Sequence, residues 1–155
     1  MQLEAYLLIQ YRIFNYPIMS GSMFGWGVGD VIALVKLAAK VRAAYKDAPH
    51  SYRHISEEVK SLQIIIKKAA KHFEGTTLSE DDQQEGQEVL KGCQSVLEDL
   101  DSLIETYKSL ASADDKVQFF KKVKLGTEDT ATLRARLISN TGLLSSFIQR
   151  LVPLV

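Results

Sequence analysis

Helical periodicity is clearest in residues 52–73, which read YRHISEEVKSLQIIIKKAAKHF. The apolar side chains of this stretch recur at alternating steps of three and four residues: Tyr52, Ile55, Val59, Leu62, Ile66, Ala69 and Phe73. Such spacing places them on one stripe of a single helix. The isoleucines at 64–66 favour a strand by propensity, but they fall inside the helical period, so we expect packing to override that preference. The sequence therefore predicts a long amphipathic helix near residues 50–74.

Three further segments carry stripes of the same kind. Residues 30–47 begin at Asp30, a favourable N-cap, and have the stripe Ile32, Leu34 or Val35, Ala38, Val41 and Tyr45. Residues 79–111 begin at Ser79, which with Asp82 resembles a capping box, and have the stripe Val89, Cys93, Val96 or Leu97, Leu100, Leu103 or Ile104, Tyr107 and Leu110. Residues 127–152 begin at the cap Thr127 and have the stripe Leu133, Leu137, Thr141, Leu144, Ile148 and Leu151, which Leu143 and Phe147 widen.

Four long helices joined by short polar turns predict an all-α protein. The economical arrangement is an antiparallel four-helix-type bundle, with a short helix near residues 114–124 before the last long helix. No stretch alternates apolar and polar residues over strand length, so a sheet has no support. We expect one helical-bundle domain over residues 21–155, preceded by an N-terminal extension of residues 1–20.

Composition excludes several classes of protein. The chain has 155 residues, of which 46% are hydrophobic and 25% charged, values typical of one globular domain. Its 19 basic and 19 acidic residues balance, so it lacks the basic excess that a nucleic-acid binder needs. The single Cys93 cannot form an intramolecular disulfide, which suits a reducing compartment. We therefore expect a cytoplasmic protein that does not bind nucleic acid.

The charges are segregated along the chain although they sum to zero. Residues 30–72 carry a net charge of +5, residues 76–111 a net of −7 and residues 112–155 a net of +3. One interpretation is that these charges complement one another between helices and along solvated faces. The alternative is that the basic flank meets anionic lipid.

No pattern typical of an enzyme or a cofactor site occurs. The glycines at 25, 27 and 29 do not complete a dinucleotide-binding fingerprint, and no strand precedes them. His50 and His54 have the spacing of a zinc-binding pair, but no glutamate lies between them and no third ligand is near. Cys93 falls on a predicted buried stripe, where a free cysteine acts as a small hydrophobe. We therefore expect no catalytic residue, metal, cofactor or small-molecule substrate.

An unusual segment precedes the first long helix. Small residues recur in it at every fourth position: Gly21, Gly25, Gly29 and Ala33. That interval lets helices approach closely, as in membrane-embedded pairs. Residues 13–35 have the length of a bilayer span and Asp30 as their only formal charge, but Pro17, Asp30 and the glycines argue against a constitutive transmembrane helix. We expect either conditional or interfacial insertion in a membrane, or an irregular lead-in that packs Phe24 and Trp26 on the bundle end.

The first 18 residues are amphipathic. Gln2 and Glu4 replace the positive n-region of a secretory signal, which disfavours secretion. We expect this extension to be either an added helix or a stretch that precedes the authentic start at Met19 or Met23.

Three stretches together resemble a known family. They are residues 24–38 (FGWGVGDVIALVKLA), 55–62 (ISEEVKSL) and 133–144 (LRARLISNTGLL). They are similar to the N-terminal helical domain of filamentous fungi that precedes NACHT or NB-ARC modules in STAND receptors and also occurs alone. The resemblance spans residues 22–152 and implies an all-α bundle related to the HeLo and HeLo-like domains. Better-known members of that group execute regulated cell death: on oligomerisation they expose an N-terminal hydrophobic, glycine-containing segment and permeabilise the plasma membrane.

The resemblance also implies roles for particular residues. Carried over to this sequence, it implies close helix packing at Gly21, Gly25 and Gly29, interfacial anchoring at Phe24 and Trp26, and anionic-lipid contact at Lys36, Lys40 and Arg42.

Two functions compete on this basis. The first is a non-enzymatic signalling or effector domain of the fungal cell-death or allorecognition type, recruited to the plasma membrane and acting there through its glycine-rich segment. The alternative is a helical protein–protein interaction module, an adaptor or self-association domain with no membrane activity, that docks a helical partner or another copy of itself. For that alternative we expect the acidic face around Glu98, Asp99 and Asp101 to contact the partner.

Overall fold

The computed structural model of the chain describes residues 28–48, 52–72, 77–110, 114–115 and 130–152. They form four long helices: α2 (Val28–Lys46), α3 (Arg53–His72), α4 (Glu80–Lys108) and α6 (Thr130–Leu151). No strand occurs among the described residues, so the all-α class expected from the sequence is confirmed. The N-terminal extension and the expected cap Thr127 lie outside the described residues, as does the expected short helix apart from the helical residues 114 and 115.

Local sequence determines where α2 and α4 begin. α2 begins two residues before Asp30, so Asp30 lies in the first turn and is not the N-cap, which corrects the expectation. An acidic side chain there still interacts favourably with the positive end of the helix dipole. Ser79 is the N-cap of α4, as expected. Its hydroxyl oxygen accepts a hydrogen bond from the backbone N–H of Asp82 at 3.2 Å, and its hydroxyl donates to the Asp82 carboxylate at 2.8 Å.

One hydrophobic core joins the four helices. The expected stripe of α3 is buried at every position that the structure describes. In the other expected stripes, the residues that are only partly buried include Val89, Tyr107, Leu110, Thr141 and Leu151.

Two further expectations about buried residues are wrong. Ile32 of α2 is only partly buried, and Val31 lies in the core instead, because α2 is apolar on most sides and its pattern does not fix the buried side. Leu143 of α6 is 54% exposed, because its neighbour Leu144 takes the core position and successive helical residues point about 100° apart.

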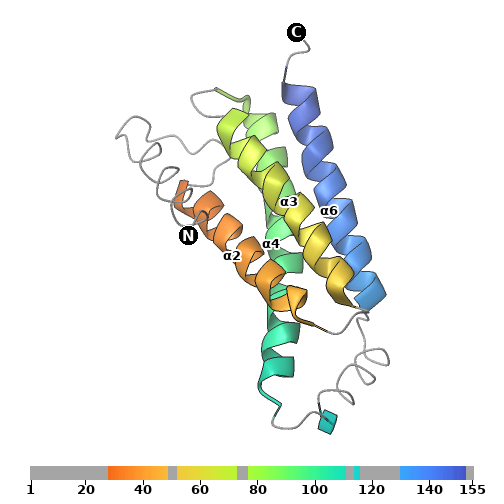
Figure 1. The fold of residues 1–155 in the computed structure, drawn as a ribbon. Helices are drawn as coiled ribbons and strands as arrows, with labels where there is room; N and C mark the ends of the chain where they lie inside the picture. The colour runs from red at the N-terminus through yellow and green to blue at the C-terminus, as the bar shows by residue number, and fades with distance from the viewer. Residues whose placement is uncertain (1–27, 49–51, 73–76, 111–113, 116–129, 153–155) are drawn as a thin grey trace.

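The arrangement of the helices places α3 and α4 on opposite sides of the bundle. α2 packs against both of them, and α6 also packs against both (Figure 1). α2 and α4 are neighbours that run in the same direction, because Asp30 lies near Gln87 and, further along both helices, Lys40 bonds Asp101. This pairing of two helices far apart in the sequence creates the candidate site.

Candidate functional site

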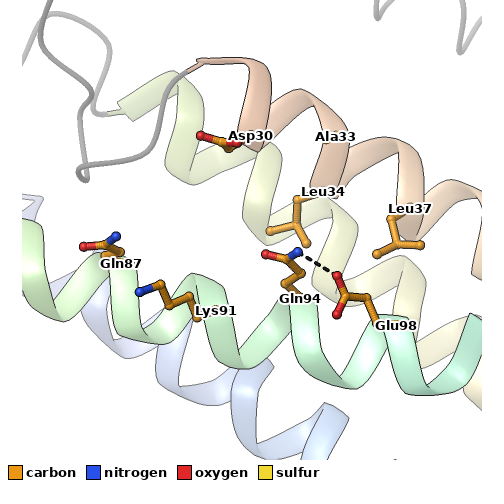
Figure 2. Close-up of a pocket in the computed structure, with 8 residues that line it drawn as sticks. All are labelled: Asp30, Ala33, Leu34, Leu37, Gln87, Lys91, Gln94 and Glu98. Atoms are coloured by element: carbon orange, nitrogen blue, oxygen red, sulfur yellow. Dashed lines mark hydrogen bonds between the residues drawn. The ribbon is translucent and has the colours of Figure 1, made fainter.

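A groove of about 530 Å³ opens between the first half of α2 and the middle of α4 (Figure 2). Its lining residues are Asp30, Ala33, Leu34 and Leu37 from α2, and Gln87, Lys91, Gln94 and Glu98 from α4. Beyond Asp30, which lies at the start of the groove, the first helix gives it an apolar wall, and the second helix gives it a polar wall.

The apolar wall follows from the spacing of residues on α2. Ala33 and Leu37 are four residues apart, so they share one face of the helix. Ala33 is exposed, Leu37 is partly buried, and Leu34 is only 3% exposed and joins the core beneath them. Leu34 therefore packs this wall against the core, while Ala33 and Leu37 present apolar surface to the groove.

The polar wall is a single stripe of α4. Its four residues recur at steps of four, three and four, which places them on one side of the helix. The Gln94 amide donates a hydrogen bond of 2.7 Å to the Glu98 carboxylate, which orients that carboxylate (Figure 2). Lys91 and Glu98 place one positive and one negative charge seven residues apart, about 10 Å along the helix.

Polar contacts hold the two walls together just beyond the groove. The Lys40 ammonium donates to the Asp101 carboxylate at 3.0 Å and lies 3.7 Å from that of Glu105. The hydrogen bond to Asp101 raises the pKa of Lys40. One turn further, the buried hydroxyl of Tyr45 donates to the backbone carbonyl of Leu100 at 2.9 Å, and burial raises the pKa of Tyr45. These contacts fix the spacing of α2 and α4 at one end of the groove.

The residues expected to contact a membrane are only partly described. Gly21, Gly25, Phe24 and Trp26 lie outside the described residues, and Gly29 lies in the first turn of α2. Of the three cationic side chains, Lys36 is exposed, Arg42 is partly buried, and Lys40 is bound to α4 as above.

The three acids expected to form one docking face have three different surroundings. Glu98 lines the groove. Asp99 accepts a hydrogen bond of 2.8 Å from Arg136 of α6. Asp101 binds Lys40 of α2, and its other carboxylate oxygen is buried without a hydrogen-bond partner. Only Glu98 therefore combines exposure with a place in the groove.

Ion pairs link the acidic α4 to both of its basic neighbours. Arg150 of α6 contacts Asp82 at 3.0 Å and Glu85 at 2.7 Å, in addition to the contacts of Arg136 and Lys40. Each such exposed pair contributes little to stability on its own. Their positions nevertheless show that much of the charge segregation in the sequence is matched between helices, as its first interpretation expects.

Sequence reasoning missed most of the groove. Ala33 and Leu37 look like ordinary helix residues, and nothing local indicates that they face α4. The available signal was the polar stripe of Gln87, Lys91 and Gln94 leading to Glu98, which is visible in the sequence.

The histidines and the cysteine are side chains that could act as catalytic groups or metal ligands. His54 is exposed at the start of α3, whereas His50 lies outside the described residues. Cys93 is buried, its thiol donates to the backbone carbonyl of Asn140 at 3.9 Å, and burial raises its pKa to about 12, so the unreactive thiol form dominates at neutral pH. In the part of the chain that the structure describes, no group of three His, Cys, Asp or Glu side chains could hold a metal ion.

The helices of the described residues include none with the length and apolar character to cross a membrane. No family model matches the chain, and no curated protein or solved structure matches it.

Proposed function

We propose that this chain is a non-enzymatic signalling domain whose α2–α4 groove docks one face of an amphipathic helix from a protein partner. The observation that carries the proposal is the pairing of an apolar wall with a polar wall along one groove. An amphipathic helix binds such a groove through apolar anchors at steps of three and four residues. The resemblance to HeLo-like domains supports a signalling role for the module.

The charges of the polar wall define the partner more closely. Lys91 and Glu98 are seven residues apart, which is two turns of helix. A partner helix with an acidic and a basic residue seven positions apart pairs with both, while its apolar stripe contacts Ala33 and Leu37. Opposite charges in this order also set the direction in which the partner lies.

The experiment titrates the isotope-labelled chain with a synthetic helical peptide and follows backbone amide shifts by NMR. The peptide carries leucines at a three-and-four spacing and a Glu and a Lys seven residues apart; a scrambled peptide of equal composition is the control. We expect saturable shifts centred on Ala33, Leu37 and Gln94 with the patterned peptide only.

Two matched variants test the location. Ala33→Arg fills the groove, whereas Ala43→Arg adds the same side chain at another exposed alanine of α2, outside the groove. We expect binding to weaken at least tenfold, about 1.4 kcal/mol, in the first variant and to be unchanged in the second. Equal affinity of the two variants, or no saturable binding by the wild type, would contradict the proposed function.

A membrane effector is the second candidate, because Lys36 is exposed on α2 next to the weakly charged residues 13–35. In this version the cytoplasmic protein is recruited to the plasma membrane, where Gly21, Gly25, Gly29, Phe24 and Trp26 insert and basic residues hold anionic lipid.

Dye release from vesicles with and without anionic lipid tests it. The proteins are chains that start at Met1 and at Met19, with a folded Trp26→Glu variant as the control. Leakage that requires both anionic lipid and Trp26 supports the membrane role, and intact vesicles in the presence of folded protein count against it.

We also propose a finer architecture, in which helices consecutive in the chain run antiparallel and residues 1–20 form an appendage to one domain of residues 21–155. The antiparallel course of α4 and α6 is supported by their ion pairs, which join Arg150 to Asp82 and Arg136 to Asp99. The hydrogen bond from Ser56, early in α3, to the carbonyl of Arg42, late in α2, supports the antiparallel course of those two helices.

A further inference from the structure

The outer side of α3 carries more positive than negative charge, because three exposed lysines share it with one exposed acid, Glu57. Lys60, Lys68 and Lys71 are exposed, and none of the three has an ion-pair partner within the described residues. They recur at helical spacing around Ile64, which is 45% exposed. We call Lys60, Ile64, Lys68 and Lys71 the basic face.

The neighbours of α3 explain why this excess of positive charge remains. α2 carries four basic residues and one acidic residue, and α6 carries three arginines and no acid. The partly buried Glu58 of α3 is already paired with Arg134 of α6. The strongly acidic helix of the bundle, α4, lies on the far side of the molecule (Figure 1).

The outer side of α4 has the opposite character. Asp82, Glu85, Asp99, Asp101 and Glu105 are paired with cations of α2 and α6. Glu80, Asp81 and Glu88 are exposed and have no cationic partner among the described residues; Glu88 only accepts a hydrogen bond from Gln84 at 3.3 Å. Asp81, Gln84 and Glu88 share one stripe of the helix. We call Glu80, Asp81, Gln84 and Glu88 the acidic face.

We infer that a second copy of this chain docks its acidic face on the basic face of the first. The charges match in sign and in spacing: Lys60 and Lys68 are eight residues apart, Asp81 and Glu88 are seven, and both intervals span about 10–12 Å of helix. Because the two faces lie on opposite sides, a docked pair leaves the acidic face of one copy and the basic face of the other free. The contact is therefore heterologous, and it extends beyond a dimer. It uses neither wall of the groove, so it stands apart from the proposed function.

Sedimentation velocity at low and high ionic strength tests the inference. We expect the average mass of the wild type to rise with protein concentration at low salt and to fall to that of a monomer when salt screens the charges. The basic-face variant Lys60→Glu with Lys68→Glu, and the acidic-face variant Asp81→Lys with Glu88→Lys, each remain monomeric alone. Mixing the two variants restores association, because faces of opposite sign meet again.

A matched control separates the docking contact from net charge. Lys36→Glu with Lys46→Glu changes two exposed lysines of α2 and alters the net charge as much as the basic-face variant, yet we expect it to associate like the wild type. Circular dichroism melts establish that each variant is folded, and binding of the groove peptide should be unchanged in the basic-face variant.

Three outcomes overturn the inference. A wild type that stays monomeric at low salt excludes self-docking through these faces. Loss of association in the α2 control shows that net charge alone is responsible. Binding of the monomeric wild type to anionic vesicles that disappears in the basic-face variant assigns this face to lipid.

Discussion

α4 and α6 approach each other closely at Gly92, and an added side chain there should reveal this contact. A Cβ built on Gly92 overlaps the Asn140 side-chain oxygen and lies 3.3 Å from the Asn140 Cγ. In Gly92→Ala, Asn140 must therefore rotate, and the hydrogen bond that its amide donates to the Arg136 carbonyl at 2.8 Å is lost. Losing that bond costs about 1 kcal/mol, which offsets the gain of about 1 kcal/mol from replacing a helical glycine by alanine. We expect no net change in stability.

Gly142 of α6 provides the matched control. A Cβ there meets nothing within 4 Å, so Gly142→Ala should keep the full gain of about 1 kcal/mol and raise Tm by about 3 °C. Urea unfolding followed by circular dichroism measures both variants. In an Asn140→Ala background, where the obstructing side chain is absent, Gly92→Ala should stabilise as much as Gly142→Ala does. Equal stabilisation by the two alanines in the wild-type background would refute the close contact between α4 and α6.

Three further predictions concern the core and its titration. Burial raises the pKa of Cys93 from 9.0 to about 12, so the free energy of unfolding is unaffected by ionisation of this thiol below pH 9 and falls as pH rises toward 12, by up to about 4 kcal/mol. Urea unfolding from pH 8 to 11 should show a steeper loss of stability with pH for the wild type than for Cys93→Ala. Equal slopes for the two proteins would contradict this. Tyr45→Phe removes the bond to the Leu100 carbonyl and should cost about 1 kcal/mol at pH 7; an unchanged urea midpoint would speak against that bond. Leu137→Ala should cost about 2–5 kcal/mol because this side chain is fully buried, whereas Ile138→Ala, at 52% exposure, should change stability by about 0.5 kcal/mol or less; similar thermal melts of the two variants would argue against this orientation of α6.

The long helices and part of their ends could be predicted because the signals are local. The stripe of α3 needs only the spacing of its own apolar residues, and every described position of it is buried. The cap at Ser79 needs only the three residues that follow it. Where a helix is apolar on several sides, as in α2, the same reasoning chose Ile32 in place of Val31, because periodicity alone did not distinguish the two.

The candidate site could not be predicted in the same way. Glu98, Asp99 and Asp101 lie close together in the sequence, yet they reach the groove, α6 and α2 respectively. Successive helical residues point about 100° apart, so a cluster in the sequence is divided among different neighbours once the helix is packed. Which neighbour each residue meets depends on the positions of helices tens of residues away.

The sequence by itself determined that the chain forms long helices, where most of its apolar stripes lie, and that its charges alternate in sign from segment to segment. Only the tertiary structure decided that α2 lies beside α4 with a groove between them, that α4 has its acids paired on two sides and free on a third, and that α3 presents its lysines on the opposite side of the bundle. The physical reason is that burial of apolar surface is non-directional. Several pairings of four amphipathic helices bury similar stripes, and the mutual fit of all four selects one of them.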